Sequence, residues 1–196
     1  MTPRDASGTR TRILDIASEL FATKGYVGTS IADIAGRLGT TKGAIYYHFN
    51  SKDAILDALV SQPVAALTKI AEEIDERTQV APAEMLGTLI DLQARFPAAY
   101  LTVYGGDPAL LQEFSHRYGL KEKTLRIVGA LAGPDATSER VVSAQIAVAA
   151  VKEGTVAALE MGKGLLSEAM RDAVLKSALA ALAAGDSAEP AELTTR

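Results

Sequence analysis

The stretch SIADIAGRLGTTKGAIYYHF, residues 30–49, predicts two short helices separated by a glycine-containing turn. Ser30 and Asp33 have a spacing related to the capping box that starts a helix, and apolar side chains then recur every three or four residues. Gly39 is suited to end this helix, because glycine readily adopts the left-handed backbone conformation that follows many helices. Two residues later, Thr41 can cap a second helix.

The second predicted helix has one apolar face and several polar positions. Ile45 and Phe49 share an inward face, whereas Lys42, Tyr47 and His48 have other faces available. A helix, a short turn and a second helix form the arrangement that offers the second helix to the major groove of DNA. The alternative is a generic three-helix subdomain, and the number of helices alone favours that alternative.

Two lysines favour the DNA interpretation. Lys42 and Lys52 each follow a predicted capping residue, so each lies in a first helical turn, where the helix dipole disfavours a cation by about 0.3 kcal/mol or more. A phosphate partner removes this conflict, because the free backbone N–H groups and the lysine then contact the same anion. Hydroxyl and imidazole donors nearby suit the same backbone contacts: Thr29, Thr41, Tyr47 and His48.

The charge is unevenly distributed along the 196-residue chain, whose net charge is −4. Residues 1–52 contain seven Lys or Arg against four Asp or Glu, whereas residues 53–196 contain thirteen against twenty. The basic excess therefore lies in the same segment as the predicted helix-turn-helix, where a polyanion would bind.

The composition argues against several other classes of protein. There is no cysteine and there are only two histidines, so we expect no disulfide, no thiolate or histidine-rich metal site and no cofactor. No GxSxG, HExxH, GxGxxG or Walker motif occurs, so we expect no catalytic residues and no enzyme. The N-terminus lacks a signal-peptide pattern, and the apolar run 141–151 is about half of the ~20 residues that a membrane span needs. We therefore expect a soluble cytoplasmic protein with no membrane partner.

The periodicity predicts an all-α fold of about nine helices. A first helix covers about 9–24 and ends at Gly25, and a long helix runs from Ser51 toward Arg77 with Pro63 as a kink or break. Further helices are predicted at 82–95, 97–104, 107–131, 135–161 and 165–184. We expect a helix-turn-helix domain at 1–50, a helical ligand-binding and dimerisation domain at 51–186 and a flexible tail at 187–196.

Half of the ten aromatic residues fall within 23 positions. They are Phe96, Tyr100, Tyr104, Phe114 and Tyr118, and Gln93 lies just before them. Such a group suits an apolar cavity with a few polar anchors, so these six residues are candidates for ligand binding. Ordinary core packing is an alternative of nearly equal weight.

The last two predicted helices are candidates for a dimer interface. Residues 141–151 are apolar or small almost all round, and small and apolar residues form a stripe along 166–181. This pattern favours a two-fold dimer that packs both helices against their copies. The alternative is that both helices pack inside one monomer.

The run from Thr9 to Leu56, and above all its core KGAIYYHFNSK (42–52), resembles the DNA-binding domain of tetracycline-repressor (TetR) family regulators. The resemblance covers about a quarter of the chain. It implies an all-helical homodimer that represses transcription from an inverted-repeat operator. A small apolar molecule that binds the C-terminal domain would move the two DNA-binding domains out of register and release the operator.

The resemblance also implies roles for individual residues. Lys42, Gly43 and Ala44 would open the recognition helix against base edges, and Tyr46 would pack along the wall of the groove. Phosphate contacts would come from Thr29, Thr41, Tyr47, His48 and Lys52. Two positions depart from the family pattern: Thr40 replaces a common aliphatic residue, and Ala44 replaces a hydroxyl residue and so offers only a methyl contact.

A second functional class remains open at this point, namely a helical small-molecule-binding dimer without DNA-binding activity. The retention of Lys42, Tyr47, His48 and Lys52 argues against it. Salt-dependent binding to DNA would distinguish the two classes.

Overall fold

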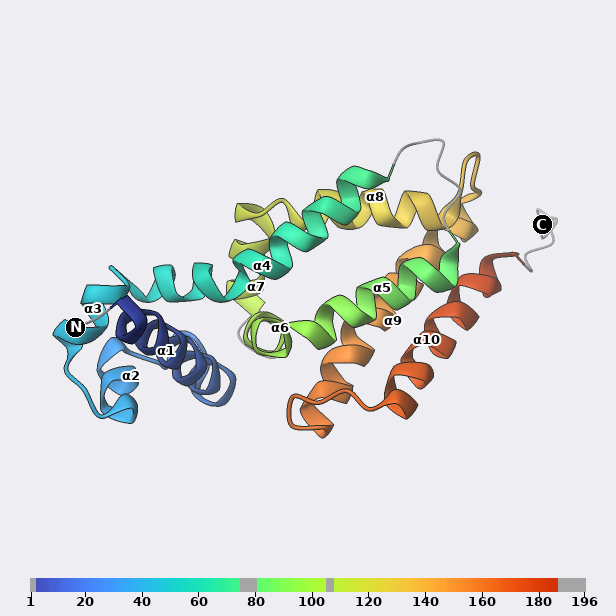
Figure 1. The fold of residues 1–196 in the computed structure, drawn as a ribbon. Helices are drawn as coiled ribbons and strands as arrows, with labels where there is room; N and C mark the ends of the chain where they lie inside the picture. Colours follow the sequence, from blue (N-terminus) through green and yellow to red (C-terminus); the bar gives the residue numbers. More distant parts are fainter. Residues whose placement is uncertain (1–2, 75–80, 105–107, 187–196) are drawn as a thin grey trace, which may run out of the picture. The chain divides into compact units, whose positions relative to one another are not determined.

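The computed structural model describes residues 3–74, 81–104 and 108–186. Within these residues the chain forms ten α-helices and one short 3₁₀ helix and contains no strand, which confirms the all-α prediction (Figure 1). The helices are α1 Pro3–Lys24, α2 Ile31–Leu38, α3 Lys42–His48, α4 Lys52–Glu73, α5 Pro82–Arg95, α6 Pro97–Tyr104, α7 Pro108–Arg117, α8 Leu120–Ala132, α9 Ser138–Met161 and α10 Glu168–Ala183; the 3₁₀ helix η1 is Ala184–Asp186.

The signals that predicted the first three helices are confirmed. Ser30 and Asp33 form a complete capping box at the start of α2, and Gly39 ends this helix with φ at 73°. Thr41 caps α3 by accepting a hydrogen bond from the backbone N–H of Ala44. Gly25 follows α1 with φ at 76°, as expected for a glycine that ends a helix.

The single helix predicted at 107–131 is wrong. Two helices, α7 and α8, occupy this region, and Gly119 separates them with φ at 60°. Left-handed backbone cannot continue a right-handed helix, and glycine adopts it without the steric cost of a Cβ. The chain therefore turns at this glycine, although the side chains around it keep a helical spacing.

Other boundaries differ less from those predicted. Helix α4 continues through Pro63 and ends at Glu73, so of the predicted kink or break the break does not occur. Helices α9 and α10 each begin three residues later than predicted, because Thr137 and Ser167 cap them. The predicted flexible tail, 187–196, lies outside the described residues.

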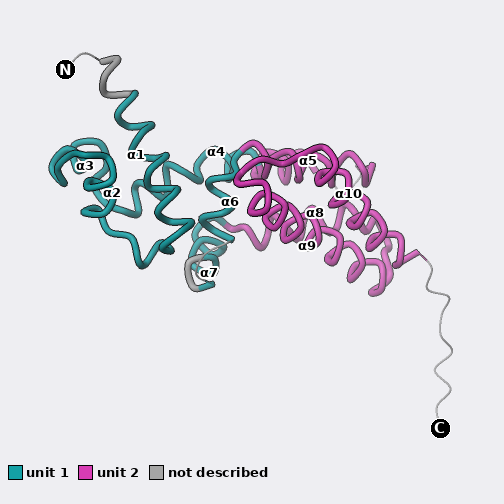
Figure 2. The backbone as a smooth tube through the Cα atoms, turned by 90° about the horizontal axis from the view of Figure 1, so that it is seen from below, with its two compact units in different colours: residues 1–66, 96–118 teal, residues 67–95, 119–196 magenta. Residues whose placement is uncertain are grey.

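The chain divides into two compact units (Figure 2). Unit 1 contains residues 1–66 and 96–118. Helix α1 packs against α2, α3 and α6, and α7 packs against α6. The core draws side chains from six helices, including Ile13, Phe21, Ile34, Ile45, Ile55 and Phe114. The helix-turn-helix therefore shares its core with the first part of α4 and with α7, while the predicted functional boundary after residue 50 stays a prediction.

Unit 2 contains residues 67–95 and 119–196. Helix α9 packs against α5, α8 and α10, and its buried face includes Ala144, Ala147 and Val151. An ion pair joins α10 to α5: the Arg171 guanidinium donates to both carboxylate oxygens of Asp91, at 2.6 and 2.8 Å. This bidentate contact holds the pKa of the Asp91 carboxyl below its usual range.

Two described helices, α4 and α9, are long and apolar enough to cross a membrane by length and composition alone. Scattered polar residues interrupt both helices, so the longest unbroken apolar run did not indicate them. One or two such helices are weak evidence for a membrane span, since core helices of soluble proteins have the same properties. Helix α9 is such a core helix, because it packs against three other helices of unit 2.

Candidate nucleic-acid interface

Helix α3 has a buried face and an exposed face. Ile45 is fully buried and Phe49, directly after the helix, is nearly so, and both belong to the core of unit 1. This confirms the predicted inward face. The remaining positions are exposed or half-buried: Thr41, Lys42, Gly43, Tyr46 and Tyr47 are exposed, and Ala44 and His48 are half-buried. The two apolar anchors thus fix the orientation of seven candidate DNA-binding residues.

Two tyrosines dominate the exposed face of α3. Tyr46 is 49 % exposed and Tyr47 is 76 % exposed, and the Tyr47 ring meets the ring of His48 edge to face at a centroid distance of 5.1 Å. Adjacent exposed aromatic rings are unusual on a surface that has no partner. Their hydroxyl groups can donate hydrogen bonds and their rings can pack along a groove, which suits a large polar partner.

Gly43 is not required by the fold of this chain. A Cβ placed on it would meet only the Thr41 hydroxyl oxygen, at an ordinary contact distance of 3.8 Å, and its φ is not positive. Glycine in a helix is less stable than alanine by about 0.5–1 kcal/mol. A close approach by a partner would explain a glycine at an exposed position where the protein leaves space for a side chain.

Thr29 and Lys52, which were expected to contact phosphates, have hydrogen-bond partners within unit 1. The Thr29 side chain is buried, and its hydroxyl donates to the backbone carbonyls of Gly25 at 2.8 Å and Leu20 at 3.2 Å. The Lys52 ammonium donates to the carbonyls of Tyr26 at 2.6 Å and Thr29 at 2.9 Å. Both groups thus donate inside unit 1, although the half-buried Lys52 ammonium has a third N–H donor, and a phosphate contact by either residue stays a prediction.

Tyr26 accounts for the position of Lys52. The ammonium lies 4.1 Å from the centroid of the Tyr26 ring, and the Tyr26 hydroxyl donates to the Asp53 carboxylate. Burial, followed by this hydrogen bond, raises the pKa of the Tyr26 hydroxyl. The dipole conflict that suggested a phosphate at Lys52 is thus resolved by two carbonyl oxygens and an aromatic face of the same unit.

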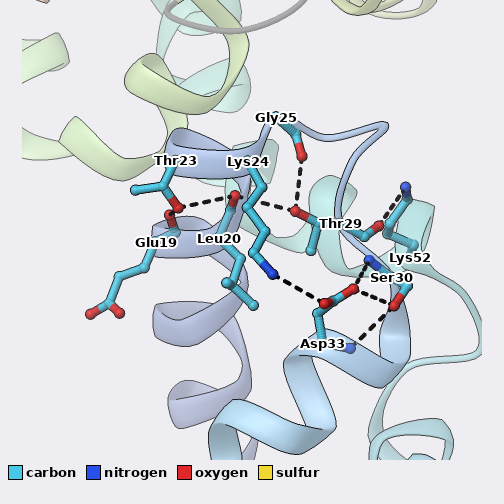
Figure 3. A network of polar contacts seen from close by, with 9 residues as sticks. All are labelled: Glu19, Leu20, Thr23, Lys24, Gly25, Thr29, Ser30, Asp33 and Lys52. Atoms are coloured by element: carbon cyan, nitrogen blue, oxygen red, sulfur yellow. Dashed lines mark hydrogen bonds and ion pairs between the residues drawn. The ribbon is translucent and has the colours of Figure 1, made fainter.

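A polar network fixes the loop before α2 (Figure 3). The Lys24 ammonium lies 3.1 Å from an Asp33 carboxylate oxygen, and the backbone N–H of Ser30 donates to the other oxygen at 2.9 Å. The Ser30 hydroxyl also donates to Asp33. The Ser30 hydroxyl, the Ser30 backbone N–H and then Lys24 hold the pKa of the Asp33 carboxyl well below its usual range.

Sequence reasoning did not identify Tyr26 and Lys24, whose contacts hold the loop between α1 and α2 in place. The contacts of Tyr26 join residues 26 or 27 positions apart, so no local spacing could indicate them. The capping box, in contrast, was visible in the sequence. Its aspartate was a signal that a nearby cation such as Lys24 could find a partner there.

The six candidate ligand-binding residues belong to both units. Gln93 belongs to unit 2, and the five aromatics belong to unit 1. There, Tyr100 stacks on Tyr104 at 5.7 Å between ring centroids, and Phe114 contacts Tyr118 at 4.8 Å. Phe114 is 2 % exposed and lies in the core of unit 1. For Phe114 the core-packing alternative therefore describes its surroundings, and a ligand-binding role for the group stays a prediction.

Comparisons with known proteins agree with the position of this interface. The family model "Bacterial regulatory proteins, tetR family" matches residues 13–59. The HTH-type transcriptional repressor KstR2 of Rhodococcus jostii is 42 % identical over 66 residues, which is 31 % of this chain and 32 % of that protein. The HTH-type transcriptional regulator TtgR of Pseudomonas putida is 33 % identical over 89 residues, 45 % of this chain and 42 % of that protein. The matches thus span less than half the length of these curated relatives.

The whole fold has similar solved structures. The structure of Mycobacterium smegmatis AmtR is similar with a TM-score of 0.67 and 22 % identity, covering 93 % of this chain and 86 % of that chain. At this identity the likeness shows the fold alone. Residues 13–59 thus match the tetR family of bacterial regulatory proteins and include the helix-turn-helix, and the all-helical remainder agrees with the fold of the similar structure.

Proposed function

We propose that the protein is a transcriptional regulator, not an enzyme, that binds an inverted-repeat operator as a homodimer in the cytoplasm and releases it when a small molecule binds. The observation that carries this proposal is the exposed face of α3. Its buried anchors, Ile45 and Phe49, leave Lys42, Tyr46 and Tyr47 open to solvent. The basic excess of residues 1–52 lies in the same segment.

Each exposed residue of α3 has a distinct role in this proposal. Lys42, Gly43 and Ala44 approach base edges at the start of the helix, and Tyr46 packs along the groove wall. Thr41, Tyr47 and His48 contact phosphates. Thr29 and Lys52, proposed from the sequence as phosphate ligands, support the interface instead by fixing the loop between α1 and α2 against the start of α4.

The dimer in this proposal uses the outer faces of α9 and α10. Val141, Val142 and Ile146 of α9 are 43–56 % exposed on the single chain, although they are large and apolar. Ala173 and Ser177 form part of an exposed stripe of small residues on the adjacent α10. A second copy would cover both surfaces, and small residues would let the helices approach closely. Sedimentation as a monomer at micromolar concentration would contradict this part.

The proposal is tested by selecting binding sites for the purified protein from random double-stranded DNA. We expect an inverted repeat whose affinity falls steeply with salt. Lys42→Ala should weaken binding, whereas Lys121→Ala, which removes an exposed lysine of α8, should not. Recovery of no preferred sequence by a folded dimer would instead support a ligand-binding protein without DNA-binding activity.

A further inference from the structure

Two buried oxygen atoms in unit 2 have no hydrogen-bond partner among the described residues. They are Oε1 of Gln93 on α5 and Oγ1 of Thr155 on α9. Gln93 is 3 % exposed and Thr155 is fully buried. Buried polar atoms are nearly always hydrogen-bonded in folded proteins, because leaving one unsatisfied is costly. These two atoms therefore call for a physical explanation.

Other helical threonines show that the state of Thr155 is not inherent in a helix. The Thr102 hydroxyl donates to the carbonyl of Ala98 at 2.7 Å, and the Thr124 hydroxyl donates to that of Leu120 at 2.8 Å. In each pair the carbonyl lies four residues earlier on the same helix. Thr155 makes no such bond within the described residues, so its hydroxyl remains available to another group.

The two residues lie in the same part of unit 2. Ile90, one turn before Gln93, and Val151, one turn before Thr155, belong to the same buried core cluster. Helices α5 and α9 also pack against each other and run in the same general direction (Figure 1). Both residues therefore lie beside the apolar core that α5 and α9 share.

The surroundings of these two oxygens are apolar and uncharged. Leu89 and Ile90 lie one helical turn before Gln93, and Val151 and Leu159 lie one turn on either side of Thr155; all four are buried. No buried residue in the described part of unit 2 is charged. A ligand that carries a net charge would meet no counter-charge here, so the chemistry favours a neutral one.

We propose that Gln93 and Thr155 are the polar anchors of a site for a neutral, mainly apolar molecule that carries a hydroxyl or N–H donor. The amide oxygen of Gln93 accepts hydrogen bonds and cannot donate them, whereas the Thr155 hydroxyl can do either. This inference rests on the proposed function and specifies the effector class and two of its contacts. It retains Gln93 from the sequence-based candidates and assigns the anchoring role to α5 and α9 in unit 2.

Matched pairs of small molecules test the proposal without DNA. Suitable pairs differ only by a hydroxyl against a methyl group: phenol and toluene, cyclohexanol and methylcyclohexane, 1-naphthol and 1-methylnaphthalene. We expect the hydroxyl compound of at least one pair to bind the full-length protein about five- to tenfold more tightly in calorimetric titration. Absence of binding by all six compounds, or no preference for the hydroxyl member of any pair, would overturn the proposal.

Apolar substitutions then locate the preference. Gln93→Leu and Thr155→Val should each bring the ratio of the two affinities to about one, so that the hydroxyl compound is no longer preferred. Each should also raise the melting temperature, because each removes an unsatisfied buried oxygen. Thr102→Val is the matched control: it removes a satisfied buried hydroxyl and should lower the melting temperature without changing the preference. A preference that survives both unit 2 substitutions would overturn the assignment.

This experiment separates the inference from the proposed function. A hydroxyl preference that depends on Gln93 and Thr155, in a protein that binds no DNA sequence selectively, would leave the site intact and refute the regulator. Selective DNA binding without any such preference would leave the regulator intact and refute the site.

Discussion

The N-terminal ends of α3 and α4 are built alike, yet their lysines have different surroundings. Thr41 and Ser51 each cap a helix by accepting a backbone N–H three residues ahead, and a lysine follows each cap. Lys42 is exposed, whereas Lys52 is half-buried and donates to two carbonyl groups. The difference arises because the α1–α2 loop supplies acceptors beside α4. A lysine directly after a helix cap thus indicates that its ammonium group needs a partner. It does not show whether that partner is a phosphate or a group of the same protein.

The largest expected effect is on folding, from Lys52→Met. This change keeps most of the apolar side chain but removes two charge-assisted hydrogen bonds, and we expect the free energy of unfolding to fall by about 2 kcal/mol. Urea denaturation measures the loss, with Lys42→Met as the control that leaves stability unchanged. Equal stabilities for the two variants would remove the structural distinction between these lysines.

The next effect is on DNA affinity, from Lys42→Ala. Loss of one cationic contact per subunit should weaken operator binding by about 1 kcal/mol and reduce the slope of log K against log salt by about one to two per dimer. Titrations of operator DNA at several salt concentrations provide the measurement. Lys52→Met, studied at a temperature where it is folded, should keep the wild-type slope; a reduced slope would restore Lys52 as a phosphate ligand.

Gly43→Ala should have two smaller effects of opposite sign, one on stability and one on operator affinity. The protein leaves space for the new methyl group, so stability should rise by about 0.5 kcal/mol, while operator affinity should fall if α3 closely approaches DNA. Thermal unfolding and operator titration together measure the two changes. Unchanged affinity would show that the glycine has no role in the approach.

The smallest effect concerns pH and the loop that binds Lys52. The pKa of Asp33 is lower in the folded protein than its ordinary value of about 4, so its stabilising contribution is present above that pH and is lost as the pH falls below it. Asp33→Asn should therefore lose less stability than the wild type between pH 7 and pH 3. Ser30→Ala, which removes one donor to Asp33, should give an intermediate dependence in parallel urea titrations.

The α7–α8 region shows where sequence patterns reach their limit within the fold. Residues on both sides of Gly119 keep a helical spacing, so the local pattern favoured one helix across it. The structure places this glycine in the left-handed region, and two helices result. A helix-compatible spacing does not exclude a turn when the residue at the turn is glycine, because glycine fits both conformations.

The aromatic residues show the same limit for the candidate ligand site. Their density along the chain indicated a common cavity, but the structure divides the six candidates between two compact units and places Phe114 in a core. Gln93 was identified for its position beside the aromatics, whereas its unsatisfied oxygen emerged only from the packing of unit 2.

The sequence by itself determined the helix-turn-helix, because each of its signals acts over four residues or fewer. The capping box at Ser30, the glycine at position 39, the cap at Thr41 and the inward spacing of Ile45 and Phe49 are all local, and the structure contains each of them. The tertiary structure alone decided the partners of Thr29 and Lys52. The Lys52 ammonium meets the carbonyl of Thr29, 23 residues away, and that of Tyr26, 26 residues away, and such contacts exist only once distant segments have packed together.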